Sequence, residues 1–96
     1  MATVVIARRA RSDLADLIRT RGLPADTRVR VRASIQPLAS FPHIGKRLTG
    51  RWQGFRVILG PWPWMLLVYI YEEATNTVTI VAIHDARSLS SATTGS

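Results

Sequence analysis

The chain has 96 residues, of which 47% are hydrophobic, and this composition is typical of one small folded domain and excludes a disordered chain. Thirteen Lys and Arg against six Asp and Glu give a formal net charge of +7, and twelve of the thirteen cations are Arg. Because Arg forms bidentate pairs with phosphate and carboxylate, we expect a polyanionic partner, with a merely solvated basic surface as the alternative. The absence of Cys excludes disulfides and thiolate zinc sites, and we predict no metal and no cofactor.

No targeting or membrane segment is evident in the sequence. The first residues form a short apolar run that is followed by Arg8 and Arg9, an order that is not typical of a secretory signal. The longest apolar run, Trp62 to Tyr71, is much shorter than the roughly 20 residues that a membrane-spanning helix needs. We therefore expect a soluble, cytoplasmic protein that does not bind membranes.

The N-terminal part of the chain predicts a strand followed by a helix. Residues Thr3–Ala7 are apolar and β-branched, which favours a short strand. Ser12 is a candidate N-cap, with Asp13 and Asp16 in the first turn of the predicted helix, where the helix dipole favours acids. Gly22 is expected to end this helix. Its apolar face comprises Leu14, Leu17 and Ile18.

The local pattern of residues 27–36 is consistent with either a strand or a helix. Apolar and basic residues alternate here with a period of two, which indicates a strand. Val31, Ile35 and Leu38 also follow helical spacing, and Asp26 or Thr27 is suited to cap a helix. Pro37 disfavours both the interior of a helix and a central strand. The local sequence therefore leaves the choice open.

Residues 40–54 predict a long polar connection, which is often a functional segment in so small a domain. We expect Ile44, Leu48 and Trp52 to anchor it on the core. Three strands follow with short connections, which predicts an antiparallel meander whose central strand is buried on both faces. The predicted strands are Gly54–Gly60, Trp64–Tyr71 and Asn76–His84, and the predicted flexible C-terminal tail is 89–96.

Four short motifs within this frame carry a family resemblance. In order, the motifs are FPHIGKRLTG (41–50), GFRV (54–57), LLVY (66–69) and VAIHDAR (81–87). Between Val4 and Ser88 the chain resembles the RelE/ParE superfamily, the toxic halves of type II toxin-antitoxin pairs. The resemblance implies one domain, 1–88, with an α+β fold of order β-α-α-β-β-β, in which a helix hairpin packs on a small, mainly antiparallel sheet. It also implies that 27–36 is helical, with a kink at Pro37.

The superfamily contains two kinds of toxin, and the resemblance bears on which kind this is. RelE-like members are ribosome-dependent, metal-free mRNA endonucleases, whereas ParE-like members inhibit DNA gyrase by binding. In a nuclease, the implied catalytic residues are His84 as acid or base, with Arg56, Arg87 and Lys46 stabilising phosphate charge. Leu66, however, occupies the position where nuclease members usually carry Arg. The apolar residue there and the ending His84-x-x-Arg87 resemble ParE-like members more closely, so we favour gyrase inhibition, with RNA cleavage as the alternative.

If the protein acts by binding, its cations and one Trp are the candidate contacts. His84 at a strand end is also typical of a structural histidine, and Arg87 is also suited to pair with Asp85. Trp62 is suited either to pack on the helices or to anchor a partner. The candidate target-binding residues are Lys46, Arg47, Arg51, Arg56, Arg87 and Trp62.

An excess of Arg on a small toxin also predicts an acidic antitoxin that folds on binding. Two other classes are an inactive toxin homologue and a basic nucleic-acid-binding module, although a module of the second kind usually displays exposed aromatics on its sheet. We expect the open reading frame beside this gene to encode a protein with an acidic carboxy-terminal half. Sequencing the neighbouring frame checks this, and a basic or absent neighbour contradicts the toxin hypothesis.

Overall fold

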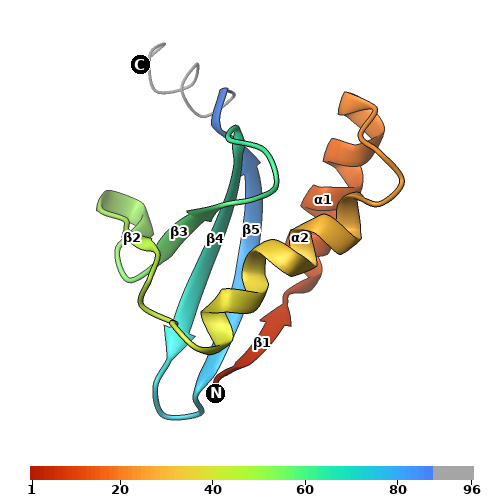
Figure 1. Cartoon of the computed structure of the whole chain (residues 1–96). Helices are drawn as coiled ribbons and strands as arrows, with labels where there is room; N and C mark the ends of the chain where they lie inside the picture. Colours follow the sequence, from red (N-terminus) through yellow and green to blue (C-terminus); the bar gives the residue numbers. More distant parts are fainter. Residues whose placement is uncertain (88–96) are drawn as a thin grey trace.

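Two helices cover one face of a five-stranded sheet in the computed structural model (Figure 1), which describes residues 1–87. The predicted tail, 89–96, lies outside the described residues. No helix within 1–87 has the length and apolar character needed to cross a membrane. In chain order the elements are β1 (Thr3–Ile6), α1 (Arg8–Arg21), α2 (Thr27–Ile35), the 3₁₀ helix η1 (Gln36–Ala39), β2 (Lys46–Arg47), the 3₁₀ helix η2 (Gly50–Trp52), β3 (Arg56–Leu59), β4 (Met65–Glu72) and β5 (Thr77–Asp85).

The sheet has the strand order β1-β5-β4-β3-β2, with β1 parallel to β5 and every other pair antiparallel. The predicted meander is therefore confirmed as β3-β4-β5, and the predicted α+β fold is confirmed with β2 added as a short edge strand. The pairing of β4 with β5 shifts between Val68 and Tyr69, and this leaves Val81 of β5 without a partner. Side chains of β4 keep their alternation on both sides of the shift.

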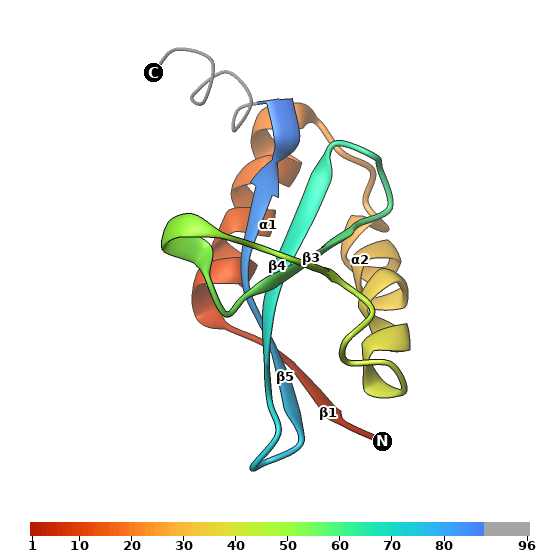
Figure 2. The ribbon, with the colours of Figure 1, turned by 90° about the vertical axis from the view of Figure 1, so that its left-hand side faces the viewer.

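That alternation divides the sheet into a helix face and an open face. Met65, Leu67 and Tyr69 of β4 are fully buried in the core beneath the helices. Leu66 and Val68 point to the open face, which is turned towards the viewer in Figure 2. Val68 is buried and Leu66 is half-buried, so the central strand is largely covered on both faces, as its sequence predicts. The helices contribute Ala10, Leu14, Val31 and Ile35 to the core, and η1 contributes Leu38.

Helix α1 begins at Arg8, one turn earlier than Ser12, so the predicted N-cap is wrong. Ala7 occupies the cap position without a side-chain hydrogen bond. The earlier start buries Ala10 completely, and this packing outweighs the capping preference. Asp13 has a different role, because its carboxylate accepts a hydrogen bond of 3.0 Å from the Ile83 amide, two residues after the unpaired Val81. The predicted end is confirmed, since Gly22 closes the helix in the left-handed conformation at φ 60°.

Residues 27–35 are helical, which resolves the segment that local sequence left open. Val31 and Ile35 are buried while Val29 is 71% exposed, a distribution that only a helical period produces. Asp26 caps α2 by position but makes no capping bond, and its carboxylate instead pairs with Arg30 at 2.9 Å. The chain changes from α to 3₁₀ geometry at Gln36, next to Pro37, where the family resemblance predicts a kink.

Asp85 joins the end of β5 to helix α1. Its side chain is 3% exposed and pairs with Arg21 of α1 and with Arg87, whose Nη2 lies 3.1 Å away. The hydrogen bonds from Arg87 and the charge of Arg21 outweigh burial and hold the pKa of Asp85 below its usual value. The charged form is therefore the one that the folded state stabilises.

We expect Asp85→Asn to destabilise the fold by about 1–2 kcal/mol at pH 7, because two Arg lose their carboxylate. A depressed pKa contributes stability above the unfolded value of about 4 and loses it as the pH falls through the folded value. In urea unfolding, the stability difference between wild type and variant should therefore be largest above pH 4 and should shrink as the pH falls below it. Asp16→Asn, which alters an exposed pair with Arg19, is the matched control and should change stability little. A difference that does not shrink between pH 7 and pH 2 contradicts this assignment.

Candidate functional site

A basic hairpin, residues 46–56, projects from the edge of the sheet away from the helices (Figure 1). It comprises β2, η2 and the first residue of β3, and η2 crosses the open face (Figure 2). Four of the six candidate target-binding residues lie on it, and no ion pair within residues 1–87 involves any of the four. Unpaired cations on a projecting element are suited to bind an anionic partner. The four are Lys46, Arg47, Arg51 and Arg56.

The predicted anchors of this connection differ from one another in burial. Leu48 and Trp52 are half-buried, as expected of anchors. Ile44 is 63% exposed, so its prediction as an anchor is wrong. The anchoring role at this point belongs to Gly45, which is buried between Tyr69 and Arg56.

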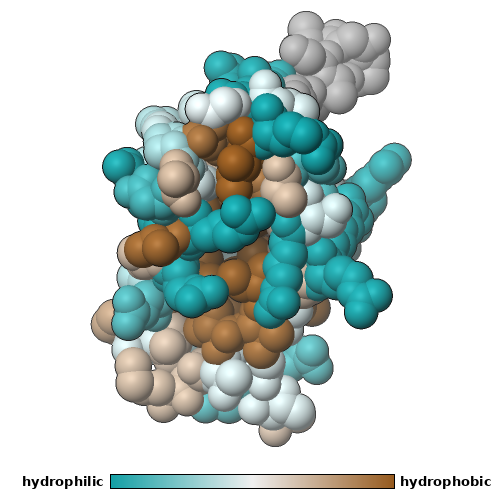
Figure 3. Space-filling model, turned by 90° about the vertical axis from the view of Figure 1, so that its right-hand side faces the viewer, coloured by the Kyte–Doolittle hydropathy of each residue, from teal (hydrophilic) through white to brown (hydrophobic). Residues whose placement is uncertain are grey.

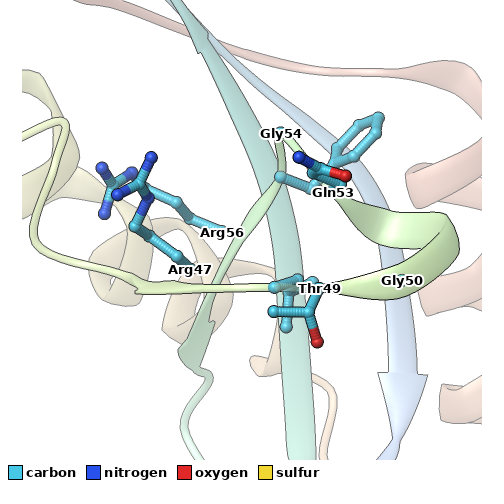
Figure 4. A pocket seen from close by; sticks show the side chains of 8 residues that line it. Arg47, Thr49, Gly50, Gln53, Gly54 and Arg56 are labelled. Carbon is cyan, nitrogen blue, oxygen red and sulfur yellow. The ribbon is translucent and has the colours of Figure 1, made fainter.

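Arg47 and Arg56 lie side by side because β2 and β3 place them opposite each other (Figure 4). Partners in antiparallel strands project from the same face, so the two guanidinium groups concentrate positive charge at one point. They flank a pocket of about 480 Å³. The other lining residues, Leu48, Thr49, Gly50, Gln53, Gly54 and Phe55, carry no charge.

Tyr69 of β4 supports this hairpin from inside the core. Its hydroxyl accepts a hydrogen bond from the Gly45 amide and donates one to the Pro42 carbonyl, each 2.9 Å long. Arg56 Nη1 donates to the carbonyls of Gly45, at 2.9 Å, and His43, at 3.2 Å. Burial raises the pKa of Tyr69, although the Gly45 bond and the charge of Arg56 act against it, so the hydroxyl stays protonated and able to donate. From sequence Tyr69 is simply a core residue, and its contact with Gly45 follows only from the structure.

His84 lies on the open face, opposite Leu66. Its ring meets Trp52 of η2 edge to face, with centroids 5.8 Å apart. Its Nε2 is buried and has no hydrogen-bond partner within residues 1–87. A general acid or base must reach its substrate, and this Nε2 is buried beside Trp52, although His84 as a whole is half-buried.

Arg87 and Trp62 belong to a third location, at the end of the sheet. Arg87 pairs with Asp85 and places its guanidinium over Trp64, 5.1 Å from the ring centroid. Trp64 stacks on Trp62 at 5.9 Å, and the guanidinium of Arg30 of α2 lies over the Trp62 ring, 5.9 Å from its centroid. Cation–π and aromatic contacts of this kind stabilise partly exposed side chains. Trp62 thus packs against a helix residue and remains half-buried.

The three residues of the nuclease hypothesis do not converge. Arg56 is opposite Tyr69 and therefore projects from the helix face, whereas His84 projects from the open face. Arg87 comes two residues after Asp85, whose partner in β4 is Met65. Met65 lies four residues from Tyr69 along β4, which is about 13 Å at roughly 3.3 Å per residue. The arrangement is suited to anion binding, and in the part of the chain that the structure describes no acid–base pair stands beside these cations.

Within residues 1–87 no group of three or more His, Asp or Glu is placed to hold a metal ion. The chain carries no Cys, so thiolate ligands are also absent from the sequence.

Comparison with known structures identifies the fold. The chain is similar to a chain of the toxin-antitoxin complex RelBE2 from Mycobacterium tuberculosis, with 23% identity and a TM-score of 0.64 over 88% of this chain and 96% of that one. It is similar to a metal-bound toxin from Helicobacter pylori, with 23% identity and a TM-score of 0.64 over 93% and 99%. For the intact RelBE complex of E. coli the values are 16% and 0.63 over 90% and 98%. At these identities the likeness establishes the fold alone.

The chain therefore has the α+β fold of these solved toxins, which is the fold that the sequence motifs predict. A family model described as the ParE toxin of the type II toxin-antitoxin system parDE matches residues 4–89. The chain belongs to this ParE toxin family. No curated protein matches the sequence.

We expect His84→Leu to leave growth inhibition intact and to keep or raise the thermal midpoint of unfolding. The substitution removes a buried nitrogen that has no partner and adds an apolar side chain beside Leu66 and Trp52. Growth after induction and a thermal melt of the purified variant are the measurements. A folded variant that no longer inhibits growth contradicts the structural role of His84.

Proposed function

We propose that this toxin inhibits DNA gyrase by binding it, and that the basic hairpin supplies the main contacts. The observation that carries the proposal is the set of hairpin cations, Lys46, Arg47, Arg51 and Arg56, which have no acidic partner within residues 1–87. Cations that the fold does not pair are available to an anionic surface of a protein or to the phosphates of DNA held by it.

The geometry around His84 and Leu66 supports binding over RNA cleavage. Metal-free cleavage needs a proton donor or acceptor beside the cations that stabilise the phosphorane. Here Arg56 projects from the helix face and His84 from the open face. The cross-strand neighbour of His84 is Leu66, at the position where a nuclease would carry a cation. An inhibitor that acts by binding needs no such convergence.

Ribosome-dependent cleavage of mRNA is the second candidate function. Its support is the Arg47–Arg56 pair beside the pocket of about 480 Å³, since two adjacent guanidinium groups are suited to a backbone phosphate. In this mechanism Arg56, His84 and Arg87 would be the catalytic residues, and η2 would have to move away from His84. The gyrase proposal requires no such movement.

The natural partner in this proposal is an acidic antitoxin that neutralises the toxin before it reaches its target. Charge supports it, because a chain of net charge +7 attracts an acidic segment at long range. Trp62, with Arg30 and Arg87 around the Trp62–Trp64 stack, is a further candidate contact for either the antitoxin or the target.

We expect the double variant Arg47→Ala/Arg51→Ala to require at least tenfold more protein for half-maximal gyrase inhibition, because it removes two unpaired cations from the hairpin. Arg19→Ala is the matched control, an exposed Arg of α1 whose loss should have no effect on inhibition. Arg56 is left in place because it also holds the carbonyls of His43 and Gly45. Supercoiling by purified gyrase is the measurement.

Cells in which the toxin or its His84→Ala variant is induced distinguish the alternative functions. Gyrase-trapped double-strand breaks in DNA with intact messages support the proposal. Codon-phased cuts in ribosome-bound mRNA that vanish in His84→Ala overturn it in favour of the nuclease. If the folded protein produces neither signal, the chain is an inactive toxin homologue.

A further inference from the structure

Apolar surface is recessed on the helix side of this toxin and projects in the connection before β2. The recess is a groove between β1 and the two helices, which Figure 3 shows as a hydrophobic strip flanked by hydrophilic side chains. Its lining includes Arg11, Arg28 and Arg32. The projecting surface is the turn before β2, where Phe41 is 62% exposed and Ile44 is 63% exposed. A groove receives side chains from a partner, whereas a projecting turn inserts its own.

Residues 41–44 form a β-turn, because the Ile44 amide donates a hydrogen bond of 3.1 Å to the Phe41 carbonyl. Pro42 occupies the second position of this turn, which its fixed φ favours. The Phe41 amide donates to the Pro37 carbonyl of η1 at 2.9 Å, which fixes the start of the turn. Phe41 and Ile44 are the first and fourth residues, whose Cα atoms lie within about 7 Å of each other in a β-turn. Their exposed side chains therefore stand close together.

Hydrogen bonds to its backbone hold this turn on the sheet. The Tyr69 hydroxyl donates to the Pro42 carbonyl at 2.9 Å, and Arg56 Nη1 donates to the His43 carbonyl at 3.2 Å. The His43 ring also meets the ring of Tyr71 edge to face, with centroids 5.2 Å apart. A turn that is fixed in advance loses little conformational entropy when a partner binds it. The fold thus presents two large apolar side chains to solvent on a rigid support.

Two features distinguish this pair from the apolar residues that are scattered singly on most protein surfaces. The two side chains are neighbours on one rigid turn, and the exposed cations Lys46 and Arg47 lie two and three residues after Ile44. Neither cation makes an ion pair within residues 1–87. An apolar centre with charged groups at its border is typical of a protein–protein interface.

We propose that Phe41 and Ile44 anchor the toxin on gyrase by entering an apolar recess of the enzyme, and that carboxylates at the border of this recess meet Lys46 and Arg47. The inference rests on the proposed inhibition of gyrase by binding. It deepens that function by assigning the target surface a shape and a charge. Because the turn continues directly into the basic hairpin, one face of the target contacts both.

The chemistry of the turn favours a protein surface over DNA or a second copy of this chain. DNA presents mainly phosphates along its backbone, so it would contact the cations and leave Phe41 and Ile44 in water. A symmetric pairing of two copies centred on the turn would bring Lys46 and Arg47 close to the same residues of the partner, and like charges oppose that contact.

Phe41→Ser/Ile44→Ser should require at least tenfold more toxin for half-maximal inhibition of supercoiling by purified gyrase, and should weaken direct binding to gyrase by at least the same factor. Phe41→Leu/Ile44→Leu keeps two large apolar side chains and should retain inhibition. Val29→Ser is the matched control, because it removes an apolar side chain of α2 that is 71% exposed and lies outside the turn. Thermal melts of all these variants should coincide with wild type, since exposed side chains contribute little to stability.

Salt separates the apolar contact from the charges beside it. High salt screens Lys46 and Arg47, whereas it does not weaken the burial of Phe41 and Ile44. The loss of gyrase binding in Phe41→Ser/Ile44→Ser should therefore persist from low to high salt. A loss that disappears at high salt overturns the apolar role of the turn.

Weaker gyrase binding by the double Ser variant, with unchanged binding of the full-length protein encoded beside this gene, supports the proposal. Equal inhibition by wild type and this variant overturns it and leaves gyrase as the target. A folded wild-type toxin that neither binds nor inhibits gyrase rejects the proposed function itself, and the inference with it. A variant that loses only the neighbouring protein, or a wild-type dimer in sedimentation that the variant dissociates, also overturns the proposal.

Discussion

The hydroxyl of Tyr69 is the contact that ties the functional loop to the core. A completely buried side chain must satisfy its polar atom, and here the Gly45 amide and the Pro42 carbonyl do so. The contact leaves no room for a larger residue, since a Cβ on Gly45 would lie 2.6 Å from the tyrosine ring. Because Arg56 binds the carbonyl of the same glycine, the orientation of one hairpin cation is fixed from within the core.

The alternation of β4 distributes the candidate residues between two environments. Odd-numbered residues of β4, such as Tyr69, point to the helix face, and Arg56 is the neighbour of Tyr69 on that face. Leu66 points to the open face, where His84 is its neighbour. A nuclease needs its cations and its proton-transfer group in one place, and a strand that separates them by face works against that chemistry. Binding of an anionic partner has a simpler requirement. The cations of one hairpin can act together without a proton-transfer group beside them.

The positive charge of the chain divides into paired and unpaired cations. Asp side chains form ion pairs with Arg near the helix ends and the end of the sheet. Asp85, for example, pairs with Arg21 and Arg87. Within residues 1–87, every Arg without an acidic partner except Arg8 lies at one of two places, the basic hairpin at the β2 edge or the groove at the β1 edge. These two edges are at opposite ends of the strand order. Two anionic partners, or one long partner that crosses the sheet, match this distribution better than a uniform solvated surface does.

The sequence by itself determined the meander, the first strand, the end of α1 at Gly22 and the family, because these depend on local periodicity, turn chemistry and short motifs. The helical conformation of residues 27–35 was decided by packing against the sheet. Burial of Val31 and Ile35 selects the helical period over the strand period, and the local pattern matches both equally. The start of α1, the exposure of Ile44 and the contact of Tyr69 with Gly45 also followed only from tertiary packing. The candidate cations were visible in the sequence, but strand register alone decided which of them share a face, because a shift of one residue would exchange the two faces.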